Sequence, residues 1–285
     1  MERGRVPAQK KWIYWAMSAV LFLLLLGLTF RPWEREDRQE VQIVAFGDSV
    51  LGLFRGEDGI AAQVGSRLHK TVYCAGLGGT CVGRLDREDR LDYGKDSLSL
   101  AALTKAVLMK DFGPQRTVFL KESLTEYFGE TIDGLAKLDF DAVELVLIEH
   151  GLNDFYAGVP LRNEEDPMDE RTFAGALRSS LEALRKTNPD VRIVLVTPTF
   201  TWMLEGAYTC EEFDAGYGNQ EAYVAEELRI AAEYGVEVID VYHDFFPHEE
   251  WDDWKRYTMD GLHPNEAGRR LIAETIANYL EGGKE

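Results

Sequence analysis

Five short apolar runs, separated by segments of helical length, constrain the fold of this chain more than any other feature. The runs are Val41–Phe46, Thr71–Cys74, Ala142–Glu149, Val191–Val196 and Val236–Val241. They are nearly continuous in apolar residues, which is typical of strands buried on both faces. Because strands joined by helices form crossover units, the pattern predicts a parallel sheet with helices on both sides.

The segments between the runs supply the predicted helices. The amphipathic stretch Glu170–Lys186 stops at Asn188-Pro189, and Glu221–Tyr234 stops at Gly235. Further helices are predicted at Gly59–His69, Leu98–Met109, Ile132–Leu138 and Pro264–Leu280. Proline fits the first turn of the last helix, where its missing N–H costs nothing. With no internal repeat or second boundary, residues 41–285 should form one three-layer α/β/α domain with a five-stranded parallel sheet.

The N-terminus has a different character from the rest of the chain. Residues 1–11 carry four basic side chains and one acidic one, and residues 12–30 carry no charge. An apolar run of this length can span a bilayer as one helix, and its basic flank should stay in the cytoplasm. We predict a cytoplasmic tail (1–11), a transmembrane anchor (12–30) and a charged stalk (31–40). The alternative is a cleaved signal peptide, but the run ends at Phe30-Arg31-Pro32, a poor cleavage site.

Charge and cysteine content exclude other classes of protein. The formal net charge is −19 and the isoelectric point is near 4.7, so nucleic acid, which is bound by clustered Lys and Arg, is a poor partner. The three cysteines are Cys74, Cys81 and Cys210. Their odd number rules out a fully paired framework, and no zinc-binding spacing occurs. We expect free thiols, with a single bridge as the alternative.

Polar or glycine-rich segments follow the predicted strands at four places. These segments are Gly47-Asp48-Ser49, Gly76–Thr80, Gly151–Asp154 and the pair Asp260 and His263. Ligands of parallel α/β sheets bind beyond the carboxyl ends of the strands, so the four segments should converge at one edge.

Each of these segments carries a residue type suited to serine hydrolase chemistry. The Ser49 hydroxyl needs a base within hydrogen-bond reach, and His263 can provide it if Asp260 fixes the imidazole. The backbone N–H groups of Ser49 and Gly76 and the side-chain amide of Asn153 could hold a developing oxyanion. No metal or organic cofactor is needed for this chemistry.

These segments resemble the four blocks of the SGNH (GDSL-type) hydrolase family, over roughly residues 41–280. The resemblance implies a flavodoxin-like fold, the triad Ser49, Asp260 and His263, and an oxyanion hole of Ser49, Gly76 and Asn153. Two positions depart from the family pattern: Cys74 stands where Asn is usual, and Leu152 where Thr is common. Neither supplies a catalytic group, but the second-block loop could differ in shape.

Together, location and resemblance predict a membrane-anchored, extracytoplasmic serine ester hydrolase. Its substrates would be small-molecule or glycan esters, with O-acylated saccharides favoured and lipids next; this substrate class is an expectation from the family and location alone. An O-acyltransferase on the same fold and a non-catalytic glycan-binding surface module are the alternatives.

Other residues near the four segments are predicted to be structural, or have both a structural and a functional interpretation. Asp48 and Asp154 should tie down their loops by hydrogen bonds, and His150 should be a packed strand-end residue. The aromatic residues of 200–218, with Phe155 and Tyr156, could line an acyl or sugar pocket or could pack locally. These two interpretations of the aromatic loop stay open.

Overall fold

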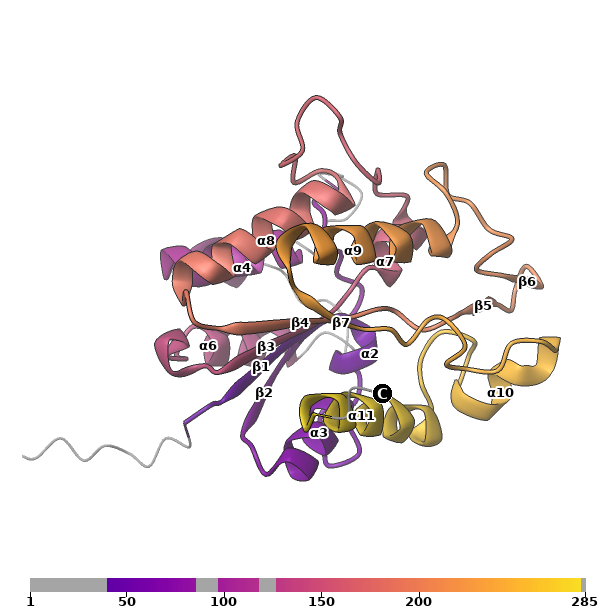
Figure 1. Cartoon of the computed structure of the whole chain (residues 1–285), viewed down its shortest axis with the longest axis horizontal. Helices are drawn as coiled ribbons and strands as arrows, with labels where there is room; N and C mark the ends of the chain where they lie inside the picture. Colours follow the sequence, from indigo (N-terminus) through magenta and orange to yellow (C-terminus); the bar gives the residue numbers. More distant parts are fainter. Residues whose placement is uncertain (1–39, 86–96, 118–126, 283–285) are drawn as a thin grey trace, which may run out of the picture. The chain divides into compact units, whose positions relative to one another are not determined.

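Five parallel strands form the central sheet in the computed structural model, which describes residues 40–85, 97–117 and 127–282 (Figure 1). The strands are β1 (Ile43–Gly47), β2 (Val72–Gly76), β3 (Leu145–Glu149), β4 (Arg192–Val196) and β7 (Glu237–Ile239). Their spatial order is β2-β1-β3-β4-β7 and every pairing is parallel. This flavodoxin-like order places the topological switch point between β1 and β3, where ligand sites of such sheets lie.

Helices cover both faces of the sheet and confirm the predicted three layers. On one face lie α4 (Leu100–Met109), α8 (Phe173–Thr187) and α9 (Gln220–Tyr234), and on the other lie α3 (Ile60–Leu68) and α11 (Glu266–Leu280) (Figure 1). In addition, α6 (Tyr127–Leu135) contacts the edge strand β2. β1 and β3 are buried along their whole length, as their apolar composition predicted.

The start of the last helix differs from the prediction. Asn265, not Pro264, precedes the first turn, and its side chain accepts a hydrogen bond from the Gly268 N–H. Pro264 lies outside the helix, in an isolated antiparallel bridge with Thr258. The prediction of a first-turn proline was wrong because an asparagine cap satisfies one of the free N–H groups of the turn, which proline cannot do.

Short elements are the main part of the fold that the sequence pattern did not predict. They are the helices α2 (Ser49–Gly52), α5 (Gly113–Arg116), α7 (Leu152–Ala157) and α10 (Trp254–Tyr257), the 3₁₀ turns η3 (Phe140–Ala142) and η4 (Trp251–Asp253), and the hairpin strands β5 (Trp202–Met203) and β6 (Tyr208–Thr209). Each is too short to show a hydrophobic period. The predicted strand Ala142–Glu149 is shorter in the structure: Ala142 belongs to η3, and β3 begins only at Leu145.

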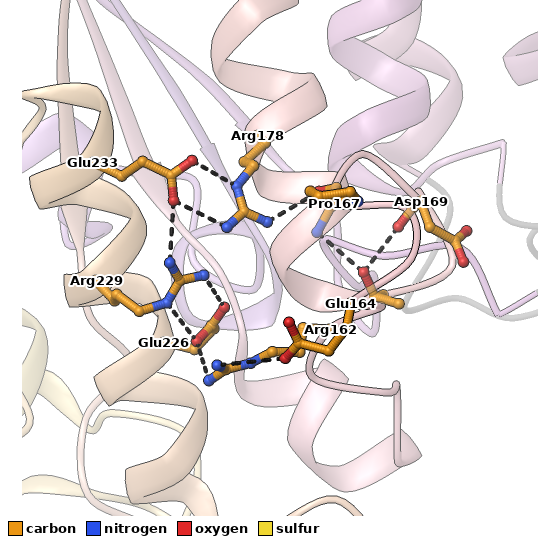
Figure 2. A network of polar contacts seen from close by, with 10 residues as sticks. Arg162, Glu164, Pro167, Asp169, Arg178, Glu226, Arg229 and Glu233 are labelled. Atoms are coloured by element: carbon orange, nitrogen blue, oxygen red, sulfur yellow. Dashed lines mark hydrogen bonds and ion pairs between the residues drawn. The ribbon is translucent and has the colours of Figure 1, made fainter.

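An arginine–glutamate network joins α8, α9 and the loop before α8 (Figure 2). Arg178 makes two hydrogen bonds to the Glu233 carboxylate, both 2.9 Å, and a third to the Pro167 carbonyl. The buried Glu226 carboxylate receives Arg162 and Arg229, both at 2.6 Å. Paired guanidinium groups offset the cost of burying that carboxylate, so the network fixes the helical layer on this face.

A second contact joins the beginning and the end of the described chain. Arg269 of α11 donates to the backbone carbonyl of Asp58 at 2.9 Å and to its carboxylate at 2.8 Å. The same guanidinium lies 3.6 Å from the centre of the Phe54 ring. Charge, hydrogen bonds and stacking therefore hold α11 beside the segment that leads from α2 to α3.

The N-terminal predictions fall outside the described residues. The predicted tail (1–11) and anchor (12–30) belong to residues 1–39, so these domain boundaries stay predictions. Among the helices of residues 40–282 that the structure describes, none combines the length and apolarity required to cross a bilayer. The three cysteines all lie among the described residues, and no disulfide joins them.

Candidate active site

Ser49 lies at the carboxyl end of β1, as the first residue of the short helix α2. Asp48 caps this helix by accepting a hydrogen bond from the Val50 N–H at 2.9 Å. The first N–H groups of a helix have no partner within the helix, so the Ser49 amide is suited to donate to a substrate oxygen. Gly47 is required for close packing, because a methyl group on it would lie 2.5 Å from the Leu51 side chain.

The structure brings the three predicted triad residues together. His263 Nε2 lies 3.0 Å from Ser49 Oγ, although 214 residues separate the two positions. On the other side of the ring, His263 Nδ1 lies 2.7 Å from Asp260 Oδ2. The second carboxylate oxygen accepts hydrogen bonds from the backbone N–H groups of His263 and Leu262, at 2.8 and 3.0 Å. This order, hydroxyl–imidazole–carboxylate, can deprotonate Ser49 during attack.

Backbone contacts hold the Asp260–His263 loop in place. The Gly261 carbonyl accepts the Trp202 N–H at 2.9 Å, and the Gly261 N–H donates to Thr258 Oγ1 at 3.0 Å. Gly261 has φ +86°, and a methyl group on it would lie 2.4 Å from the Trp202 carbonyl oxygen. Only glycine meets both conditions without strain, so the β5 strand fixes the loop that carries the base.

The predicted oxyanion donors occupy different surroundings. Asn153, in α7, directs its side-chain nitrogen to Asp48 Oδ2 at 2.9 Å and to the Thr80 carbonyl at 3.1 Å. Both contacts hold it beside the nucleophile, and it must exchange one of them to donate to a substrate. The Gly76 carbonyl accepts a hydrogen bond from Arg55, and the glycine packs directly against Gly52 of α2.

Gly78 is the glycine of this segment that lies against the nucleophile. A methyl group on Gly78 would lie 3.6 Å from Ser49 Cβ. Gly76, in contrast, allows α2 to approach the edge strand, since a methyl group on Gly76 would lie 2.7 Å from the Gly52 nitrogen. The oxyanion roles of Gly76 and Asn153 therefore stay predictions. The Gly78 N–H donates to the Tyr127 hydroxyl, so the next residue, Gly79, is the further candidate for the same task.

Residues 45–271 match the family model for the GDSL-like lipase/acylhydrolase family. The match covers well over half of the chain. The chain belongs to this family. Its activity class is ester hydrolysis by a serine nucleophile, and the resemblance seen in the sequence is confirmed.

Solved structures with this fold come from several bacteria. A protein from Lactobacillus plantarum has a TM-score of 0.59 and 20% identity, covering 87% of this chain and 99% of that chain. A possible lipase from Chitinophaga pinensis has a TM-score of 0.56 and 17% identity, covering 85% of this chain and 98% of that chain. A carbohydrate acetylesterase from Sinorhizobium meliloti has a TM-score of 0.51 and 15% identity, covering 85% of this chain and 99% of that chain. These identities establish the fold alone. Among curated proteins, no sequence matches significantly.

Buried acidic groups surround the nucleophile of this GDSL-like chain. Burial raises the pKa of Asp48 to about 6 and that of Asp154 to about 7, against opposing hydrogen bonds from backbone N–H groups. Asp154 accepts from the N–H groups of Val82 and Gly83, so both aspartates tie down loops, as predicted. Burial also lowers the pKa of His150 to about 3, which leaves a neutral, packed imidazole with no catalytic contact among the described residues.

The pKa of Asp260 shifts in the opposite direction, below its usual value. Partial burial alone would raise its pKa, but hydrogen bonds from the backbone and side chain of His263 and from the Leu262 N–H lower it below the usual value. The carboxylate is therefore ionised when His263 accepts a proton, which is what stabilisation of an imidazolium requires. Across the described residues, no group of His, Cys, Asp and Glu is arranged to hold a metal ion.

The aromatic side chains of the loop between β4 and α9 pack mainly against neighbouring aromatic rings. Trp202 is fully buried against Phe200, with ring centres 4.9 Å apart. Phe213 lies between Phe155 at 5.5 Å and Tyr208 at 5.5 Å. Local packing is therefore the better interpretation for these rings, while Tyr217 is exposed.

The Asp-x-x-His spacing of Asp260 and His263 occurs a second time in the chain. Asp240 and His243 follow β7, and His243 Nδ1 lies 2.7 Å from Asp240 Oδ2. Its Nε2 faces Glu221 Oε2 at 3.0 Å instead of a serine. The sequence motif alone would have found this pair, but only the structure shows that it lacks a nucleophile.

Two further residues near Ser49 carried no sequence signal. Tyr127 and Arg55 contact the glycine-rich segment after β2 and the strand itself. Neither belongs to a motif, and both reach the site through space from separate elements.

Proposed function

We propose that this protein is a membrane-anchored, extracytoplasmic serine esterase whose triad is Ser49, His263 and Asp260. The observation that carries the proposal is the continuous contact from Ser49 Oγ to His263 Nε2 at 3.0 Å and from His263 Nδ1 to Asp260 Oδ2 at 2.7 Å. Family membership supports ester hydrolysis independently of this geometry.

The mechanism follows from the positions of these atoms. Ser49 Oγ attacks the ester carbonyl while His263 Nε2 takes its proton, and Asp260 stabilises the imidazolium. The Ser49 N–H, the Asn153 amide and a backbone amide of the segment Gly76–Gly79 would hold the oxyanion. His263 then protonates the departing alcohol. Water, deprotonated by the same imidazole, releases the acid from Ser49.

We propose O-acylated saccharides as the substrate class, with lipid esters as the second candidate. One protein of the same fold is a carbohydrate acetylesterase, which supports the proposal by analogy of fold. The apolar run 12–30 and its basic flank support an anchor with the catalytic residues outside the cytoplasm. The full protein should then be found in the membrane fraction of untreated cells, and protease treatment of intact cells should digest the residues after the anchor.

The decisive experiment compares the full chain in non-ionic detergent with its Ser49→Ala variant. Aryl esters of acetate, butyrate and octanoate, together with an acetylated monosaccharide, serve as substrates. We expect the wild type to hydrolyse short acyl esters, and Ser49→Ala to lower kcat by at least about 10³-fold, since the nucleophile and base act as a unit.

Equal turnover by Ser49→Ala would contradict the mechanism. An inactive wild type that still binds saccharide would favour the glycan-binding module. An added acceptor sugar that becomes acylated would instead identify a transferase.

A further inference from the structure

The glycine-rich segment beside Ser49 is held by a tyrosine from another element. The hydroxyl of Tyr127, in the first turn of α6, accepts the Gly78 N–H at 3.0 Å. Gly78 lies against Ser49, as a methyl group on it would be 3.6 Å from Ser49 Cβ and 3.5 Å from the tyrosine oxygen. The Tyr127 hydroxyl therefore sets the orientation of the peptide bond between Leu77 and Gly78, next to Ser49.

Arg55 extends the same arrangement to the end of β2. Its guanidinium donates to the Cys74 carbonyl at 2.7 Å and to the Gly76 carbonyl at 3.1 Å. The guanidinium carbon lies 4.9 Å from the centre of the Tyr127 ring, within the range of a cation–π contact. One side chain thus contacts both the strand that leads into the glycine segment and the ring that holds that segment.

The Cys74 side chain makes only weak contacts at the end of β2. The family usually carries Asn at this position, whereas the Cys74 thiol here contacts the Leu51 carbonyl at 3.6 Å and Arg55 at 3.7 Å. A thiol is a weak hydrogen-bonding group. The strong bonds to the backbone of the strand end come instead from Arg55, with its fixed fork of donors.

We propose that Tyr127 and Arg55 are positioning residues for the reaction, which orient the glycine segment Gly76–Gly79 toward the oxyanion formed at Ser49. The inference rests on the proposed esterase function. Neither side chain needs to touch the substrate. Because oxyanion donors act only when they are aimed at the transition state, a misplaced segment should lower kcat and leave KM nearly unchanged.

The test variant is Tyr127→Phe, which keeps the ring beneath Arg55 and removes the acceptor for Gly78. Tyr73→Phe is the matched control, because the Tyr73 hydroxyl also joins β2 to α6, through the Thr131 carbonyl at 2.6 Å, but away from Gly78. Turnover of acetate, butyrate and octanoate aryl esters is measured with the full chain in detergent. The rate at which a fluorophosphonate labels Ser49 is measured in parallel.

We expect Tyr127→Phe to lower kcat roughly 10- to 100-fold, equally for the three acyl groups, with KM within a factor of about two. Labelling should slow in parallel, and Arg55→Lys should show a smaller loss of the same kind. Tyr73→Phe should lower the melting temperature while kcat stays within about twofold of wild type.

Three results would overturn the positioning role while leaving the esterase intact. They are a wild-type kcat in Tyr127→Phe, a loss that depends on acyl length, and an equal loss in Tyr73→Phe. Ser49→Ala separates the two proposals: a wild type without turnover or labelling, or a Ser49→Ala variant with full turnover, refutes the proposed function and the positioning role with it.

Discussion

The loop after β7 and the loop before α11 each place a histidine against an aspartate three residues upstream. In both, imidazole Nδ1 lies 2.7 Å from the carboxylate. In both, the other carboxylate oxygen accepts the backbone N–H of the histidine, at 3.2 Å for His243 and 2.8 Å for His263. Even the residue after each aspartate is held alike, since Val241 and Gly261 both donate to a threonine hydroxyl.

What differs is the group beyond Nε2. His263 faces the Ser49 hydroxyl, and His243 faces the Glu221 carboxylate, each at 3.0 Å. A hydroxyl can give up its proton to the imidazole, whereas a second carboxylate favours an imidazolium that stays protonated. The short Asp-x-x-His segment therefore only orients the ring, and the distant partner decides whether the pair is a catalytic base or an ion pair.

The largest expected difference between the two pairs is in turnover. Asp260→Asn should lower kcat by about 10³- to 10⁴-fold, because an amide favours the wrong tautomer of His263. Asp240→Asn makes the same chemical change at the other pair and should leave kcat within about twofold. Steady-state kinetics of both variants on one aryl ester provides the comparison. A similar loss in Asp240→Asn would show that the second pair takes part in the reaction.

A smaller difference is expected from two glycines with positive φ, Gly261 inside the Asp260–His263 loop and Gly235 at the end of α9, before β7. Gly261→Ala combines positive φ with a close contact to the Trp202 carbonyl, so it should cost roughly 2–3 kcal/mol of stability and also lower kcat. Gly235 has φ +60° but nothing within 4 Å of an added methyl group. Gly235→Ala should therefore cost only about 1 kcal/mol and leave kcat unchanged. Urea unfolding and kinetics of both variants measure this, and equal effects would remove any special role for the β5 contact.

The smallest expected effect is a change with pH in the stability that the ion pair of His243 with Asp240 and Glu221 contributes. The hydrogen bond to Asp240, together with Glu221, raises the pKa of His243. Its contribution to stability is therefore complete below the ordinary histidine pKa of about 6.5 and is lost as pH rises through the raised value. The side chain is 43% exposed, so solvent screening limits the contribution to less than about 1 kcal/mol.

The corresponding test compares wild type with His243→Asn by urea unfolding at about pH 5.5 and about pH 9, on either side of that interval. The wild type should be the more stable protein at the lower pH, and the difference should shrink at the higher one. A difference that grows with pH would mean that His243 is held neutral.

The sequence was sufficient for the strands because a strand buried on both faces has to be apolar along its length. β1 and β3 lie where their apolar runs predicted, within a few residues. Short elements escaped because four or six residues, as in α2 and α7, show no periodicity. The convergence of Ser49, Asp260 and His263 could be predicted because each lies in a segment that follows a strand, and parallel strands end at one edge.

The remainder of the site depends on contacts through space. The hydrogen bond of Asn153 to Asp48 and the contact of Tyr127 with Gly78 join residues that share no motif or period. Glycine posed a related problem, since a glycine needed for close packing, such as Gly76, looks the same in sequence as one that donates to an oxyanion.

The contact of Arg269 with Asp58 and Phe54 has a consequence for biosynthesis. During translation Ser49 is synthesised 214 residues before His263. Arg269, which contacts Asp58 and Phe54, follows only with α11. A nascent chain that ends before His263 has Ser49 without its proposed base and without the contact of Arg269 with Asp58 and Phe54. On the proposed mechanism, hydrolysis can therefore begin only when synthesis is nearly complete.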